Sequence, residues 1–323
     1  GWVNSQVFDH TSSLQLLEKW LSAKYRKDIR EPNISNWRRA VAGDLTSVFR
    51  KEEGDASANP EFLNRDKFVE TIHKAQFKNP PSNFRALTPR EVEQLVHSPH
   101  TTMLLPQQET GTRNACAIPY ELYADMSVGQ NKDVVLRLKS GTRVFGNATA
   151  GAPFHVYAPL SYHGTRFRTW AYTVAPGDEL TSAWSLDRFD QPGYCLRVHG
   201  PNGFFREFAN DGPFAGISVQ LKNAGAPGTS SGSYVVLENT GDEPLNIVIR
   251  DNAYGLPEKS VSVAARQSVQ VPIDVSGSYG WYDFTVMIKE QPKFAYHYAG
   301  HIETGAHSKT DPLMGDAIGQ LNS

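Results

Sequence analysis

A carboxylate and an imidazole stand side by side near the start of the chain, and they are the first pair whose types could do chemistry. Asp9 and His10 directly precede an apolar helical pattern. An aspartate can orient a histidine ring for proton transfer or for metal binding. No third ligand and no nucleophile follow at a supporting spacing, and a polar pair at this place typically caps a helix. Asp9 and His10 are therefore weak catalytic candidates, and a structural role is the simpler interpretation.

The other residues with chemical potential do not assemble into a motif. The remaining histidines are scattered, and the sequence contains no GxSxG, no P-loop and no dinucleotide fingerprint. Several aromatic residues late in the chain follow strand spacing, which suggests either a platform for sugars or choline or, more simply, the core of a β-sandwich. They are Trp281, Tyr282, Phe294, Tyr296 and Tyr298. On these residues alone we expect no active site, no bound cofactor and no metal in this chain.

Composition and net charge argue against nucleic acid as a partner and against a membrane-spanning helix. The 323 residues carry a formal net charge of -2 and 39% hydrophobic residues, so no electrostatic footprint for nucleic acid is visible. No apolar run approaches the ~20 residues that a membrane-spanning helix needs, and residues 1–5 carry no export signal. Because an apolar helix begins within a dozen residues, we expect that an upstream part of the protein is missing from this sequence.

The first third of the chain has a helical texture. Thr11 to Tyr25 predicts an amphipathic helix with Leu14, Leu17 and Leu21 on one face, and with Ser12 and Gln15 placed as a capping box. Two further helices are expected at Pro60 to Ala75 and at Pro89 to His97. Residues 56–114 therefore form a helical linker region in this interpretation, which ends with an irregular stretch at 101–114.

From Tyr120 onward, short runs with a period of two residues predict strands separated by turns. Asn202-Gly203 is the sharpest hairpin signal, because these residues tolerate the positive φ angles of a type I′ turn. Tyr194, Leu196 and Val198 recur as Tyr282, Phe284 and Val286, an offset of 88 residues that suits one small sandwich. We expect two tandem β-sandwiches at 115–211 and 212–307, and a loosely held tail at 308–323.

Several strings then carry a family resemblance. Residues 2–12 (WVNSQVFDHTS), 31–35 (EPNIS), 200–208 (GPNGFFREF), 280–284 (GWYDF) and 298–305 (YAGHIETG) resemble bacterial phosphocholine-preferring phospholipases C, whose catalytic domain is alkaline-phosphatase-like. The resemblance covers nearly the whole chain. It implies a mainly β chain with an α-helical N-terminal part, in which two tandem sandwiches follow the C-terminal remnant of an α/β catalytic domain at residues 1–55.

The same resemblance implies the function of a parent enzyme. That enzyme would be exported, secreted or periplasmic, and would hydrolyse phosphatidylcholine or sphingomyelin to release phosphocholine, with a hydroxyl nucleophile and a divalent metal ion. In the family these groups lie upstream of the first matching string. We therefore expect this chain alone to be inactive and its partner to be the upstream catalytic segment.

The sequence also leaves a second function open. The chain can instead be an independent binding module for a glycan, a membrane or a partner protein, although its apolar N-terminal helix favours a piece of an enzyme.

The two cysteines, Cys116 and Cys195, fit no zinc or redox spacing. In an exported protein, with one before the first strand and the other in a late strand, they predict a disulfide within the first sandwich.

Overall fold

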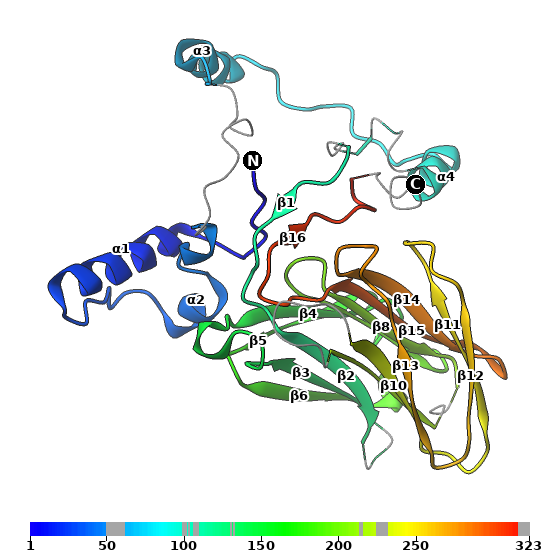
Figure 1. Cartoon of the computed structure of the whole chain (residues 1–323). Coiled ribbons are helices and arrows are strands. Elements are labelled where there is room, and N and C mark those ends of the chain that lie inside the picture. Colours follow the sequence, from blue (N-terminus) through cyan, green and yellow to red (C-terminus); the bar gives the residue numbers. More distant parts are fainter. Residues whose placement is uncertain are drawn as a thin grey trace.

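The computed structural model of the chain describes residues 1–49, 62–98, 102, 104–105, 110–129, 131, 133–212, 216–223 and 232–315. Strands dominate it, and helices are confined to the N-terminal third, as the sequence predicted. Figure 1 shows a large β body with two helices packed at one side and two more standing apart from it. No helix among the described ranges is long and apolar enough to cross a membrane.

In the first helix, α1 (His10–Tyr25), the N-cap lies three residues before the predicted one. Asp9 is the N-cap, since its side chain accepts a hydrogen bond from the backbone of Thr11, while Ser12 bonds back to the backbone of Asp9. The predicted pair of Ser12 and Gln15 was therefore wrong. Asp9 with Ser12 and Ser12 with Gln15 both have the spacing of a capping box. Asp9 is the N-cap because Arg38 also pairs with its carboxylate.

Helix α2 (Asn36–Val41) and the single turn η1 (Thr46–Val48) follow α1 and hold it through polar contacts. Arg39 of α2 donates two 2.8 Å hydrogen bonds to the carboxylate of Glu18, and Gln15 donates to the carbonyl of Ala42. Ser12 and Gln15 are the buried side chains of α1. The helix therefore faces the protein with its polar side, which is the reverse of the usual arrangement.

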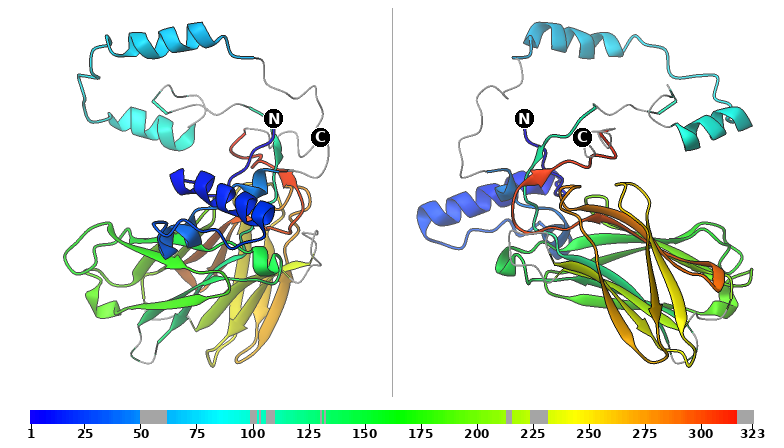
Figure 2. Two further views of the ribbon diagram at one scale, coloured as in Figure 1. Left: turned by 90° about the vertical axis from the view of Figure 1, so that its left-hand side faces the viewer. Right: turned by 45° about the vertical axis from the view of Figure 1, so that its right-hand side comes forward.

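Helices α3 (Arg65–Ala75) and α4 (Pro89–His97) bury none of their side chains. Both views of Figure 2 place them away from the β body. The bounds of α4 match the prediction, because Thr88 and Glu91 form a complete capping box around Pro89. For α3 the predicted end was right and the predicted start was wrong, because residues 62–64 are not helical and Asn64 caps the helix. Residues 60–61 lie outside the described residues.

Two sets of seven strands form the β body, and we call them module 1 and module 2. Module 1 contains β2 (Leu122–Val128), β3 (Val134–Ser140), β4 (Ala152–Ala158), β5 (Arg168–Val174), β6 (Glu179–Trp184), β7 (Tyr194–His199) and β8 (Phe205–Asn210). Module 2 contains β9 (Ile217–Asn223), β10 (Ser233–Asn239), β11 (Leu245–Asp251), β12 (Lys259–Val263), β13 (Ser268–Pro272), β14 (Trp281–Ile288) and β15 (Gln291–His301). The repeat in the sequence thus matches a strand-by-strand repeat in the structure.

The strand order shows that the modules share one sheet. Each module contributes a separate three-stranded sheet, β2-β3-β6 in module 1 and β9-β10-β13 in module 2. The remaining strands form one eight-stranded sheet in the order β12-β11-β14-β15-β8-β7-β4-β5, joined by antiparallel pairing of β15 with β8. The last strands of the two modules are therefore partners, and corresponding strands follow in the same order on either side of this pair.

One hydrophobic core runs through both modules. Phe208 of β8 is fully buried and makes edge contacts with Tyr296 and Tyr298 of β15, with ring centroids 5.1 and 6.1 Å apart. The hydroxyl groups of Tyr194 and Tyr296 form a 2.7 Å hydrogen bond across the same junction. The modules are therefore fused side by side, and their joint is a packed core instead of a flexible linker.

The two ends of the β region are tied together by a short sheet of β1 (Asn114–Ala115) and β16 (Ser308–Lys309). Val3 forms a bridge with Ala115, and Trp281 donates from its indole to the carbonyl of Lys309. The expectation of a loose tail was wrong for residues 308–315, because side-chain and backbone hydrogen bonds hold them along their length. Residues 316–323 lie outside the described residues.

Few contacts attach the N-terminal helices to module 1. The phenol of Tyr120 accepts a 2.9 Å hydrogen bond from the backbone of Val7, and the indole of Trp37 donates to Thr173 at 2.8 Å. Gly151 lies so close to the carbonyl of Ala40 that an added Cβ would approach the oxygen to 2.7 Å. The glycine therefore permits α2 to rest directly on the edge of the sheet.

Candidate functional site

The structure gives Asp9 a structural role and brings no catalytic partner to His10. Asp9 caps α1 and pairs with Arg38, and hydrogen bonding by Thr11 lowers the pKa of its carboxyl despite an opposing effect of burial. His10 is the exposed first residue of the helix. Within the ranges that the structure describes, no group of three or more His, Cys, Asp or Glu residues could hold a metal ion.

The predicted disulfide is not formed in this structure, where both cysteines are free. Cys116 is buried beside the N-terminal segment and bonds through its backbone to Val3. Cys195 lies on the outward face of β7, because Tyr194 and Leu196 on either side of it point into the core. Burial, followed by the charge of Glu207, raises the pKa of the Cys195 thiol to about 12, so it is a poor nucleophile.

The aromatic residues late in the chain form core and no exposed platform. All five are at least nine-tenths buried, and Tyr296 and Tyr298 lie at the joint between the modules. The simpler of the two interpretations was therefore right. The conspicuous site lies beside this joint, where the structure opens a polar pocket.

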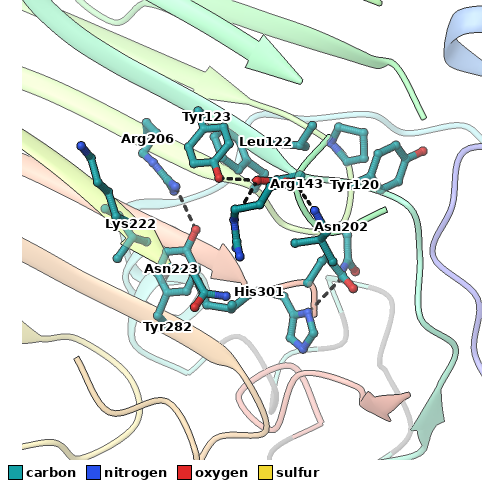
Figure 3. A pocket seen from close by; sticks show the side chains of 17 residues that line it. Tyr120, Leu122, Tyr123, Arg143, Asn202, Arg206, Lys222, Asn223, Tyr282 and His301 are labelled. Carbon is teal, nitrogen blue, oxygen red and sulfur yellow. Dashed lines mark hydrogen bonds and ion pairs between the residues drawn. The ribbon is translucent and has the colours of Figure 1, made fainter. Parts of the chain in front are cut away.

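This inter-module pocket lies where β2, β9, the β7–β8 hairpin and the end of β15 meet (Figure 3). It encloses about 60 Å³. We define it by the side chains that argue for its chemistry, which are Tyr120, Glu121, Tyr123, Arg143, Asn202, Arg206, Lys222, Asn223, Tyr282, His301 and Glu303.

The hairpin that forms one wall follows from its sequence. Asn202 and Gly203 both have positive φ angles, 54° and 71°, and the backbone of Phe204 donates to the carbonyl of Pro201. This is the type I′ geometry that Asn-Gly favours. The tight turn places Asn202 at the pocket, where its amide donates a 3.0 Å hydrogen bond to Glu303.

Arg206 forms the floor of the pocket and is only 4% exposed. Its guanidinium donates to the carbonyls of Phe205 and Ala299 and, at 2.9 Å, to the hydroxyl of Tyr282. It also lies over the ring of Phe204, 4.2 Å from the centroid. Cation–π contacts with aromatic faces partly replace the water that a buried guanidinium has lost.

His301 and Glu303 form a buried pair on the opposite wall. The imidazole Nδ1 lies 2.9 Å from the carboxylate of Glu303, and Nε2 lies 3.0 Å from the carbonyl of Tyr279. A carboxylate and a carbonyl only accept hydrogen bonds, so this arrangement favours the imidazolium form of the ring, which has a proton on both nitrogens. Burial opposes this charge, but the bond to Glu303 outweighs it and raises the pKa of His301.

Glu121 closes the third wall. Its carboxylate accepts from the phenol of Tyr123 at 2.7 Å and from the backbone of Val144 at 2.8 Å, and Arg143 lies 3.6 Å away. Burial, and then the bond to Glu121, raises the pKa of Tyr123 well above its ordinary value, so its proton stays on the phenol. Each acidic group of the pocket is thus already engaged by donors of the protein.

A wider groove of about 630 Å³ continues the pocket between the two three-stranded sheets. It shares Glu121, Tyr123, Arg143, Lys222 and Asn223 with the pocket and adds Asp125, Arg137 and Lys139. Arg137 lies 3.8 Å from Asp125. The hydroxyl of Tyr123 lies beside the carboxylate of Glu121, but its raised pKa keeps the proton on the phenol, so the arrangement is suited to binding.

Sequence reasoning missed this pocket because its walls come from distant parts of the chain. Arg206, His301 and Glu303 do fall within two strings that carry the family resemblance, 200–208 and 298–305. Those strings are therefore the signal that could have located the site. Their spacing of about a hundred residues gave no hint that they meet.

The fold and the pocket together define the class of this chain, a fused pair of β-sandwiches with a polar pocket at their joint and an attached helical segment. The family follows from comparison. A family model described as "Bacterial phospholipase C, C-terminal domain" matches residues 114–211 and 217–301, which correspond to the two modules. The chain belongs to this family.

Named relatives agree with this assignment. The chain is 33% identical to a "Non-hemolytic phospholipase C" of Burkholderia pseudomallei over 98% of its own length and 41% of the relative. A "Non-hemolytic phospholipase C" of Pseudomonas aeruginosa is also 33% identical, over 98% of this chain and 42% of the relative. A "Hemolytic phospholipase C" of the same organism is 32% identical over 97% and 43%. The chain thus spans less than half the length of these relatives.

Proposed function

We propose that this chain is the C-terminal region of a phospholipase C that cleaves phosphatidylcholine or sphingomyelin and releases phosphocholine. Residues 1–55 complete an upstream catalytic domain, residues 56–114 form a linker region, and the modules at 115–211 and 212–307 act as accessory domains. The divalent metal ion of such an enzyme is held upstream, and the whole protein is secreted or periplasmic.

The observation that carries this proposal is the extent of the similarity. Phospholipases C match this chain across 97–98% of its residues, including the helices that precede the modules, while more than half of each relative lies outside the match. A free-standing binding module has no use for those helices. They do have a use as the end of a larger catalytic domain.

The outward face of α1 supports the same proposal. Leu14, Leu17 and Trp20 are 45%, 46% and 56% exposed, although they form the apolar stripe of the helix. Fully burying such side chains is worth about 1.5–3 kcal/mol each, so an uncovered stripe favours a partner. We assign that partner to the upstream catalytic segment, because α1 already turns its polar side to its own chain.

A mass measurement tests the proposal at its root. The native protein, purified from its source and measured intact, should greatly exceed the 35.8 kDa of these 323 residues. A native polypeptide of 35.8 kDa would contradict the proposal and favour the alternative, an independent binding module for a glycan, a membrane or a partner protein.

An activity assay tests the docking of α1. In the full-length enzyme, Leu17→Glu should reduce hydrolysis of a chromogenic phosphocholine ester at least tenfold, because it puts a charge into the covered stripe. Ala23→Glu adds the same charge to an exposed position of α1 outside the stripe and should leave activity near normal. Equal activity of the two variants would rule out α1 as the docking face. Turnover by the 323-residue chain alone would overturn the upstream location of the catalytic groups.

A further inference from the structure

The inter-module pocket carries a charge that its own carboxylates do not balance. Arg206 is buried, yet no carboxylate of the described residues lies within 4.0 Å of its guanidinium nitrogens. Asp125 is the carboxylate whose pKa responds to Arg206, but it also lies 3.8 Å from Arg137 and responds to Lys222. Glu303 is engaged by His301, and Glu121 by Tyr123 and Val144. A buried cation that shares its carboxylate neighbour with two other cations is costly unless a ligand supplies further negative charge.

The surroundings of Arg206 add positive charge. Once the pair of His301 and Glu303 is set aside, the pocket and groove contain five cationic side chains and two carboxylates. The cations are Arg137, Lys139, Arg143, Lys222 and Arg206, and the carboxylates are Glu121 and Asp125. The chain as a whole is slightly acidic, with a formal net charge of -2. The positive charge is therefore a local property of the space between the modules.

The hydrogen-bond geometry supplies a donor aimed at that space. The hydroxyl of Tyr282 accepts a hydrogen bond from Arg206 at one of its two lone pairs, and it can still donate its own proton. Figure 3 shows Arg206 and Arg143 approaching Tyr282 from two sides. A hydroxyl polarised by one guanidinium and flanked by a second is a good donor to an anionic oxygen, and arginine suits phosphate in particular.

From these contacts we infer that the inter-module pocket binds a phosphate group. The oxygens accept hydrogen bonds from the hydroxyl of Tyr282 and from Arg143, and Arg206 and Lys222 supply the balancing charge. The pocket admits the phosphate group itself, and the 630 Å³ groove beyond it accommodates whatever the phosphate is attached to. A free phosphate ester and the phosphate of a lipid headgroup share this chemistry. The inference does not depend on the proposed function, since it concerns binding by this chain alone.

The first experiment uses inorganic phosphate as the probe and the 323-residue chain as it is. At constant ionic strength, replacing chloride with phosphate should raise Tm saturably, by about 3 °C at ten times Kd. Arg143→Gln combined with Lys222→Gln should weaken phosphate binding at least tenfold, because both side chains stand at the exposed rim and their loss leaves the core intact. Tyr282→Phe should weaken binding too, and its Tm without phosphate shows whether it folds.

A matched control separates a site from general charge. Arg266→Gln combined with Lys289→Gln removes the same two charges from exposed positions of module 2 away from the pocket, and it should bind phosphate like the parent chain. A Tm that responds equally to chloride and phosphate would overturn the inference. So would an equal loss of binding in the rim variant and the control.

Vesicles identify the source of the phosphate. Co-sedimentation with vesicles of phosphatidylcholine and phosphatidic acid that inorganic phosphate displaces assigns the pocket to a lipid headgroup. A phosphate-specific Tm shift without vesicle binding assigns it to a soluble phosphate ester. The inference would be contradicted if the chain bound vesicles, phosphate did not displace it from them, and phosphate did not change its Tm. That result would show attraction to the charged lipid surface alone.

Discussion

At the scale of single residues, His301 shows how burial and hydrogen bonding set a charge. The imidazolium joins three segments, because it bonds to Glu303, to the carbonyl of Tyr279 and, at 3.3 Å, to Ser308. Asn202 of the β7–β8 hairpin completes the network through Glu303. One protonated ring therefore helps to hold together the β7–β8 hairpin, the turn before β14 and strand β16.

This network predicts a pH dependence of stability. The pKa of His301 is raised on folding, so its contribution is complete below the unfolded pKa of about 6.5 and is lost as the pH rises through the folded value. The free energy of unfolding, from urea titrations at pH 6 and pH 9, should therefore decline toward pH 9. In His301→Gln, which cannot titrate, that decline should be smaller.

His307 provides the control for this titration, because it lies close to β16 and is exposed. Its imidazole accepts a 3.0 Å hydrogen bond from the backbone of Ala117, and no carboxylate among the described residues pairs with it. His307→Gln should retain the parent's dependence on pH. If His301→Gln and the parent lose the same free energy between the two pH values, His301 is not the group responsible.

At the scale of secondary structure, α1 depends on its N-cap. Asp9→Ala removes the acceptor for the backbone of Thr11 and the partner of Arg38, and should cost about 0.5–2 kcal/mol of local stability. Asp9→Asn keeps the cap and should cost less. Hydrogen exchange of α1 amides measures the effect.

His10→Ala is the companion variant for the catalytic interpretation. The side chain of His10 is exposed at the start of the helix, so its removal should leave both exchange and full-length activity nearly unchanged. A large loss of activity in His10→Ala with normal exchange would restore the pair of Asp9 and His10 as catalytic residues.

Elements were predictable where local chemistry decides them. Thr88, Pro89 and Glu91 encode the start of α4 unambiguously, whereas Asp9 and Ser12 each offer a valid cap for α1 and only the tertiary contact with Arg38 selects between them. Alternation identified the buried faces of β7 and β14. It could not reveal that β8 pairs with β15, because a period of two specifies a face and not a neighbour.

The pocket was unpredictable for the same reason. Arg206 occupies an inward position of β8 that alternation assigns to an apolar residue, and nothing local shows that Tyr282 and Phe204 surround it. Its burial is a property of the joint between the modules. The prediction of a disulfide has a similar weakness, because the spacing of Cys116 and Cys195 says nothing about the outward orientation of Cys195.

At the scale of the whole molecule, the shared sheet makes the two modules one folding unit. The five residue pairs between β15 and β8 and the aromatic contacts around Phe208 belong to both modules at once. A module that unfolded alone would expose half of this joint and leave a long unpaired strand on the other module. We therefore expect module 1 and module 2 to unfold in a single cooperative transition.

Phe208→Ala tests this expectation because it lies at the joint. Removing a fully buried phenylalanine should cost about 3–5 kcal/mol. If the modules are coupled, hydrogen exchange of β4 in module 1 and of β11 in module 2 should accelerate by the same factor, although Phe208 belongs to module 1 alone. Val261→Ala, in the edge strand β12 of module 2, is a milder variant. It too should accelerate hydrogen exchange of β4 in module 1. Accelerated exchange of β4 with an unchanged β11 would mean that the modules unfold independently, and that the joint between them is an interface and not a common core.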